Sequence, residues 1–252
     1  MLQMLESWPS APGSVELSEG EAHVWCASLD QTTQRVEEFW QVLSQKEREK
    51  ALRFHFEKDR RDFTVARGTL REILGRYYLR CTPAQVEFSY NSFGKPALAG
   101  ADTADQRGAL RFNVSHSHGI ALYAMTRGRE VGLDVEWLRD DFASEEIARQ
   151  FFSAREVEML RALPFELRTS GFFNCWTRKE AYIKALGEGL SHPLDRFAVT
   201  LAPGEPARFL SIDDDTLEAE RWSMIELHPE KGYAAALVLE GASPALRCWR
   251  YD

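Results

Sequence analysis

The chain has 252 residues, 44% of them hydrophobic, which is enough for a real core in one large domain or two small ones. Its net charge of -8 argues against broad nonspecific binding to nucleic acid. Four scattered cysteines without a C-x-x-C pair, no apolar run of membrane-spanning length and no secretory signal at the N-terminus predict a reduced, cytoplasmic protein outside the membrane.

The first half of the chain predicts a small mixed α/β unit after a loose N-terminal lead-in. Apolar periodicity and turn residues mark its elements. In chain order we expect a strand at 22–29, one or two short helices within 35–55, a long helix at 59–79, a strand at 86–90, an exposed loop at 99–108, and strands at 112–114 and 120–126.

The second half predicts the same kinds of element in a similar order. We expect a strand at 131–136, helices within 144–163, a long helix at 169–187, and strands at 196–201, 221–227 and 232–239. Gly187 and Gly189 are expected to end the long helix, because glycine readily adopts the backbone that follows a helix.

Two short similarities relate the halves. Segment 43–47 resembles 152–156, and segment 67–74 resembles 175–182, with offsets of 109 and 108 residues. The serines at the start of the first pair, Ser44 and Ser153, are both expected helix N-caps. Nearly equal offsets favour an internal duplication, although two unrelated helix pairs with common capping residues would give the same pattern.

The expected fold is therefore α/β (α+β), with two similar halves related by pseudo-twofold symmetry. Each half is a small sheet packed on a long helix, and we divide the chain into residues 1–128 and 129–252. Halves that pack side by side leave a cleft between them, where ligand sites are common.

Acidic residues mark the candidate centre. On the strand at 131–136, Asp134 and Glu136 share one face and the apolar residues share the other. Glu180 and Lys184 lie one turn apart on the second long helix. Three carboxylates suit a hard divalent cation such as Mg2+ and a phosphate substrate. Glu180 joins the pair only if the fold brings the long helix beside the strand. Otherwise Asp134 and Glu136 simply form a solvent-exposed strand face.

Polar residues follow the strand at 112–114. Ser115 and His116 are groups that can bind phosphate oxygens at a strand end. A zinc site at His116 and His118 lacks nearby cysteine or carboxylate partners, and a Ser–His hydrolase would need a G-x-S-x-G elbow. A polar turn with one capping serine is the simplest structural alternative.

Two basic features stand out from the acidic background. Lys95 lies in the tight turn 93–96, where Gly94 permits a sharp bend. A basic run also precedes and follows the start of the first long helix, and it is either a solvated helix face or a local phosphate-binding patch. Its members are Lys50, Arg53, Arg60, Arg61, Arg67 and Arg71.

Five segments together resemble a known family. They are F-G-K-P at 93–96, F-N-V-S-H-S at 112–117, V-G-L-D-V-E at 131–136, F-F-S-A-R-E at 151–156 and W-T-R-K-E-A-Y-I-K-A-L-G-E-G-L at 176–190. In this order they closely resemble the motifs of the surfactin-type 4′-phosphopantetheinyl transferases, over about residues 43–197.

The resemblance implies a monomer of two similar halves with the active site between them. It implies transfer of the 4′-phosphopantetheine arm of coenzyme A to a serine of an apo acyl, peptidyl or aryl carrier protein. It also implies the release of adenosine 3′,5′-bisphosphate. The family's pattern also places Asp134, Glu136 and Glu180 on Mg2+, with Mn2+ as an alternative, and Lys184 on the pyrophosphate. Glu180, or water on the metal, is the implied base for the carrier serine.

The resemblance further implies coenzyme A contacts outside the acidic group. Ser115 and His116 are expected on its phosphates, with His116 near the 3′-phosphate, and Lys179 is expected on the same phosphates as Lys184. The remaining expected contacts are Lys95 near the adenine end and Lys50 and Arg53 at the 3′-phosphate. Asp62 departs from the pattern, because some relatives carry a cation there, which leaves the roles of Arg60 and Arg61 open.

Two rival functions use some of the same residues. A metal-dependent phosphohydrolase or nuclease also clusters carboxylates, but here Trp137 and Leu138 follow the acidic pair in place of a lysine on the same strand. A non-catalytic carrier-binding protein need not keep all three carboxylates and Lys184, which this chain has. The segment from Asp140 to Phe152 is a candidate docking helix and loop, because it follows the acidic strand.

Overall fold

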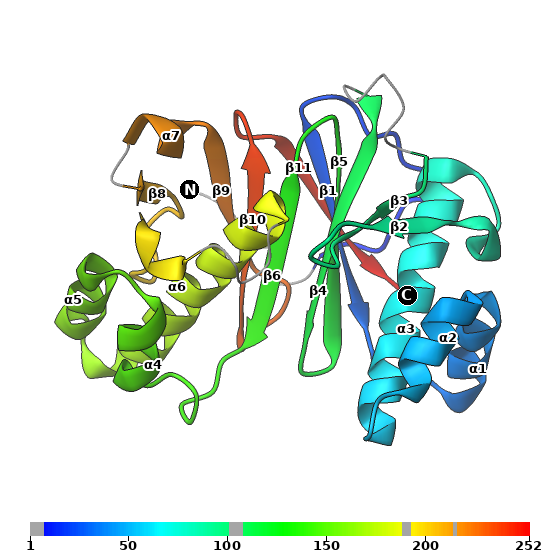
Figure 1. The fold of residues 1–252 in the computed structure, drawn as a ribbon, viewed down its shortest axis with the longest axis horizontal. Coiled ribbons are helices and arrows are strands. Elements are labelled where there is room, and N and C mark those ends of the chain that lie inside the picture. The colour runs from blue at the N-terminus through cyan, green and yellow to red at the C-terminus, as the bar shows by residue number, and fades with distance from the viewer. Residues whose placement is uncertain (1–7, 101–107, 188–192, 214–215) are drawn as a thin grey trace.

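The structure is a computed structural model that describes residues 8–100, 108–187, 193–213 and 216–252. Two β-sheets lie side by side at the middle of the molecule, and helices cover each on its outer side (Figure 1). Apolar side chains from both sheets form a core between them, including Val24, Leu122, Leu133 and Leu237. Two further cores separate each sheet from its own helices.

The first half surrounds a four-stranded sheet of order β11-β1-β5-β4. Its elements are β1 (Glu21–Ser28), α1 (Thr33–Val42), α2 (Gln45–Leu52), α3 (Glu57–Ile73), a π-helical turn (Leu74–Leu79), a 3-10 turn (Pro83–Gln85), β2 (Phe88–Tyr90), β3 (Pro96–Leu98), β4 (Leu110–Ser117) and β5 (Ile120–Arg127).

The second half surrounds a three-stranded sheet of order β6-β10-β9. Its elements are β6 (Val131–Trp137), α4 (Glu145–Phe151), α5 (Ala154–Ala162), α6 (Phe165–Leu186), a 3-10 turn (Leu194–Arg196), β7 (Phe197–Val199), β8 (Phe209–Ile212), α7 (Thr216–Glu220), β9 (Trp222–Leu227), β10 (Tyr233–Glu240) and β11 (Ala245–Tyr251).

The mixed α+β fold predicted from the sequence is confirmed, with differences at particular elements. β4 runs to Ser117, so Ser115 and His116 lie within a strand and not in a turn after it. α6 begins at Phe165, several residues before the predicted start at 169. Most of the loop predicted at 99–108, part of the N-terminal lead-in and Gly189 lie outside the described residues.

The last strand was not predicted, and it returns to the first sheet. β11 pairs in parallel with β1, with Val24 opposite Cys248 and Trp25 opposite Trp249. The end of the chain therefore completes the sheet of the opposite half. The division of the chain at residue 128 stays a prediction. No described helix has the length and apolar composition that crossing a membrane requires.

A capping box and a buried ion pair occur at equivalent places in both halves, which supports the predicted duplication. Ser44 and Ser153 each start a short helix with a capping box, closed by Glu47 and Glu156 respectively. Each of these glutamates is also buried against a cation of the following long helix. Glu47 lies 2.7 Å from a guanidinium nitrogen of Arg71 on α3. Glu156 forms the same kind of pair on α6, so both halves hold a short helix to a long one by one buried carboxylate.

Candidate active site

The predicted acidic residues meet in one pocket at the junction of the two halves. β4, β6 and α6 supply its walls, and its volume is about 350 Å3. The lining residues are Val114, Ser115 and His116 from β4, Asp134 and Glu136 from β6, and Trp176, Glu180 and Lys184 from α6. The structure thus brings together all three carboxylates, Lys184, Ser115 and His116, although they are separated by as many as 69 residues in the chain.

Close packing of α6 on β6 makes this meeting possible. The face of β6 that carries Asp134 and Glu136 also carries Gly132, because alternate strand residues share a face. A Cβ atom on Gly132 would lie 1.9 Å from the carbonyl oxygen of Ala181 on α6. Only glycine allows the helix backbone to come this near. As a result, Glu180 and Lys184 stand directly beside the acidic strand.

Asp134 is the most deeply placed of the three carboxylates, at 3% exposure. Its Oδ1 accepts hydrogen bonds from the Ser115 hydroxyl at 2.8 Å and from the Lys184 ammonium at 2.6 Å. Its Oδ2 is buried and has no hydrogen-bond partner among the described residues. A buried, unpaired carboxylate oxygen is costly, and it is a group that a bound cation would satisfy.

The pKa values of the other two carboxylates, Glu136 and Glu180, are both raised. Burial raises the pKa of Glu136, and the negative charge of Asp134 raises it further. Burial and the charge of Asp134 likewise raise the pKa of Glu180. Like charges crowded into a partly dehydrated pocket resist ionisation. This crowding is the electrostatic pattern that a divalent cation relieves, because it reverses the local potential.

The carboxylates do not already surround a metal-sized space. Across the described residues, no group of three or more His, Cys, Asp or Glu side chains forms a ready metal-binding arrangement. The Lys184 ammonium instead neutralises Asp134 directly. The donor set still fits Mg2+ or Mn2+, because it offers hard carboxylate oxygens, one of them unpaired.

His116 and Lys184 form the basic side of the pocket. The Lys184 ammonium also contacts the Ser115 hydroxyl at 3.1 Å, so one cation touches both β4 and β6. Surrounding protein atoms and the charge of Lys184 lower the pKa of His116, although part of its side chain reaches solvent. The Lys184 ammonium and the His116 ring are both groups that can donate hydrogen bonds to an anionic phosphate.

Lys179 is not brought to the pocket, in contrast to its predicted contact with coenzyme A phosphates. Its side chain is 1% exposed and its ammonium lies 2.8 Å from Glu156. It also donates hydrogen bonds to the carbonyl oxygens of Leu194 and Phe197, at 2.8 and 2.6 Å. Its amine could reach a phosphate only by breaking this buried pair, which would leave Glu156 uncompensated.

The other predicted cations lie apart from the carboxylates. The Lys95 ammonium donates to the carbonyl oxygen of Ala185 at 2.9 Å and pairs with Glu130 at 3.1 Å. It lines a second hollow of about 300 Å3 near the end of α6. Lys50 and Arg53 are exposed at the end of α2, with the Lys50 ammonium over the Phe63 ring. Their contacts with coenzyme A stay predictions.

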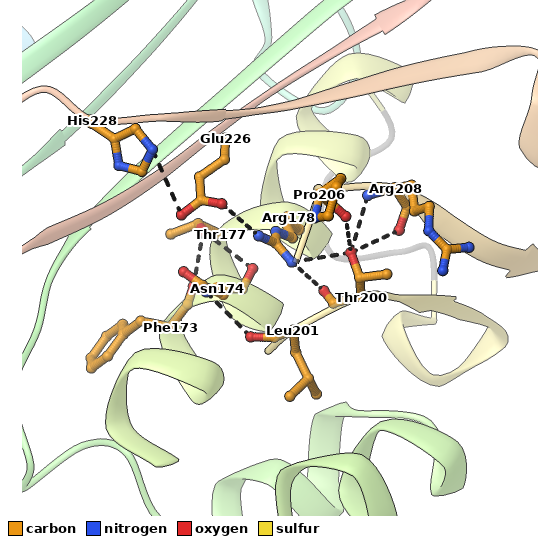
Figure 2. Close-up of polar contacts among 10 residues, drawn as sticks. All are labelled: Phe173, Asn174, Thr177, Arg178, Thr200, Leu201, Pro206, Arg208, Glu226 and His228. Atoms are coloured by element: carbon orange, nitrogen blue, oxygen red, sulfur yellow. Dashed lines mark hydrogen bonds and ion pairs between the residues drawn. The ribbon is translucent and has the colours of Figure 1, made fainter. Parts of the chain in front are cut away.

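A residue missed in the sequence anchors the far side of α6. Arg178, 1% exposed, donates hydrogen bonds to the carbonyl oxygen of Thr200 at 2.6 Å and to Glu226 at 3.0 Å (Figure 2). Asn174, one turn earlier, donates to the carbonyl oxygen of Leu201. Two positions separate Arg178 from Glu180, so the two side chains leave the helix in nearly opposite directions. These contacts therefore limit rotation of the helix that presents Glu180.

Comparison with known proteins identifies the family. Residues 130–238 match the 4′-phosphopantetheinyl transferase superfamily, and residues 27–127 match the N-terminal 4′-phosphopantetheinyl transferase family. The 4′-phosphopantetheinyl transferase HetI of Nostoc sp. is 40% identical over 251 residues, 100% of either chain. The 4′-phosphopantetheinyl transferase Sfp of Bacillus subtilis is 33% identical over 165 residues, covering 66% of this chain and 69% of Sfp. The chain belongs to the 4′-phosphopantetheinyl transferase superfamily.

Proposed function

We propose that the protein transfers the 4′-phosphopantetheine arm of coenzyme A to a serine of an apo acyl, peptidyl or aryl carrier protein. The observation that carries this proposal is the pocket in which Asp134 and Glu136 face Glu180 and Lys184. Carboxylates and a lysine in one partly buried site suit the pyrophosphate of coenzyme A and the charge changes of phosphoryl transfer.

The reaction balances without a redox partner. The oxygen of the carrier serine forms a bond to the phosphorus that bears the pantetheine arm. The bond from that phosphorus to the oxygen of the second phosphate breaks, and adenosine 3′,5′-bisphosphate leaves. Glu180 is the candidate acceptor of the serine proton, because its carboxylate lines the pocket beside Lys184.

The same three carboxylates, Asp134, Glu136 and Glu180, would hold Mg2+ or Mn2+ beside the substrate. When bound, the ion would supply positive charge to the pyrophosphate. Lys184 adds a cation that the chain itself provides, and its present contact with Asp134 is one that a phosphate oxygen could replace. Ser115 and His116 line the pocket from β4, and we propose them as contacts of the coenzyme A phosphates.

We assign the nucleotide end of coenzyme A to the first half of the chain. Lys50 and Arg53 are proposed for the 3′-phosphate and Lys95 for the adenine end, from the resemblance of their motifs. The carrier protein is proposed to dock on segment 140–152. In support, Asp140 lines a hollow of about 520 Å3 with Phe165, whose side chain is 83% exposed. We further infer that the enzyme works as a cytoplasmic monomer.

Intact-protein mass spectrometry tests the reaction. A panel of apo carrier proteins is incubated with coenzyme A and the enzyme, with Mg2+ or with EDTA. The expected result is a gain of about 340 Da, one phosphopantetheine arm on one serine, that requires Mg2+. Glu180→Gln should abolish the gain, whereas Glu19→Gln, at an exposed loop position, should not. A panel left unmodified by folded wild-type enzyme would contradict the proposed function.

A further inference from the structure

Polar side chains of β4 join the two halves along β6. Three alternate residues of β4 accept hydrogen bonds from backbone N–H groups of β6: Asn113 Oδ1 from Leu133 at 3.0 Å, Ser115 Oγ from Val135 at 3.3 Å, and Ser117 Oγ from Trp137 at 3.1 Å. β4 and β6 belong to separate sheets, so these side chains take the place of a backbone ladder. The two strands therefore stand a side chain apart, with a fixed register.

The same register places each of these β4 side chains opposite a second residue of β6, which comes one position before the residue that donates the N–H. At the middle position, Ser115 donates to Asp134 at 2.8 Å. At the outer position, Ser117 donates to Glu136 Oε2 at 2.7 Å. At the inner position the corresponding residue is Gly132, which has no side chain. Both carboxylates of β6 therefore accept a hydrogen bond from a serine of β4.

We propose that Ser117 is a positioning residue that holds the carboxylate of Glu136 toward the pocket. A hydroxyl has a single proton to donate. Because the Ser117 oxygen accepts the Trp137 N–H, its orientation is set by the backbone, and its proton is committed to Glu136. Glutamate has several rotatable bonds, so one fixed hydrogen bond removes much of its freedom before any ligand arrives.

This role extends the proposed function, because it takes Glu136 as one of the metal ligands. Partners that orient metal-binding side chains typically contribute 10–100-fold to metal affinity. Ser117→Ala removes the donor and leaves the Trp137 N–H without its acceptor. Ser117→Thr keeps a hydroxyl at the same position and suits a strand. The two variants separate loss of the hydroxyl from a change of residue.

Asn113→Ala is the matched control for the joining role. It removes the acceptor of the Leu133 N–H, which is one of the three hydrogen bonds between β4 and β6. The residue opposite Asn113 is Gly132, so no carboxylate loses a hydrogen bond. If Ser117 matters only because it links the sheets, the two alanine variants should behave alike. If it positions Glu136, only Ser117→Ala should weaken metal binding.

The test is a titration of Mn2+ alone, followed by electron paramagnetic resonance of the free ion, with the melting temperature measured in parallel. We expect Ser117→Ala to bind Mn2+ about 10–100-fold more weakly than wild type. Ser117→Thr should restore most of the affinity, and Asn113→Ala should melt earlier with its Mn2+ affinity retained. Wild-type affinity in Ser117→Ala, equal losses in both alanine variants, or no Mn2+ binding by wild type would overturn the inference. Failure of the carrier assay with Mn2+ binding intact would instead count against the proposed function.

Discussion

Gly132 offers the sharpest test of how the fold builds the active site. In Gly132→Ala, the new Cβ would lie 1.9 Å from the Ala181 carbonyl oxygen and 2.3 Å from the Ala185 backbone nitrogen. Both atoms belong to the backbone of α6, so a change of side-chain conformation cannot relieve the contact. To restore a contact of 3.0 Å, α6 and β6 must separate by more than 1 Å.

That separation would lengthen the contacts between α6 and β6 that line the pocket. The hydrogen bond from Lys184 to Asp134 is 2.6 Å, and about 1 Å more would take it beyond hydrogen-bond range. Misplacement of this size can cost about 100-fold in rate. Overpacking of a core typically costs about 1–3 kcal/mol in stability. We therefore expect Gly132→Ala to fold with a lowered melting temperature and to lose about 100-fold in kcat/KM.

The assay pairs steady-state transfer to a carrier protein with thermal unfolding. Gly13→Ala is the control, because nothing lies within 4 Å of the added Cβ at that position. The control should match wild type in both measurements. A Gly132→Ala enzyme with wild-type activity and wild-type melting temperature would refute the reasoning that close contact between α6 and β6 sets the site.

Three further predictions concern single groups. His116→Ala should mainly raise the KM for coenzyme A, and an effect confined to the KM for the carrier would contradict its placement. Lys179→Met should lower the free energy of unfolding in urea by about 3–5 kcal/mol, because Glu156 stays buried without its partner; a loss below about 1 kcal/mol would exclude this. The pKa values of Glu136 and Glu180 are raised in the folded protein. At pH values just above the ordinary glutamate pKa, the folded protein therefore binds more protons than the unfolded chain does. With EDTA present, wild type should therefore lose stability relative to Glu180→Gln as pH rises through that range, and a relative gain would contradict the sign.

The acidic centre could be predicted because its parts are local patterns. Strand alternation places Asp134 and Glu136 on one face, and helical spacing places Glu180 one turn before Lys184. That the two elements meet is a tertiary fact, and Gly132 was its one local sign. A glycine inside a strand often marks a close approach of another backbone, and here that backbone is α6.

Other features depend on contacts that no local pattern reveals. The strand was predicted to end at residue 114, with the residues after it at a strand end or in a polar turn, because hydroxyl side chains are typical of turns. In the structure these side chains satisfy backbone N–H groups of β6, which allows β4 to continue to Ser117. Lys179 was expected on phosphate from the resemblance of its motif. On a helix, consecutive residues point about 100° apart, and this turn directs Lys179 to Glu156 in the core.

Equivalent positions of the two long helices have different surroundings. Arg71 and Lys179 are the buried cations of α3 and α6, and each is followed by a glutamate, Glu72 and Glu180. Glu180 faces the pocket. Glu72 instead pairs with Arg35 and accepts a hydrogen bond from Tyr251 at 2.6 Å.

Tyr251 belongs to β11, the strand that returns from the second half to pair with β1. This crossing therefore places a donor on the glutamate of the first half. A carboxylate that is already paired and hydrogen-bonded is a poor ligand and a poor base, because its charge is satisfied. Glu72 and Glu180 occupy equivalent positions of the two long helices, but their environments differ. β11 brings a hydrogen-bond donor to Glu72, whereas other carboxylates surround Glu180. Glu72 is held by Arg35 and Tyr251, whereas burial and the charge of Asp134 raise the pKa of Glu180.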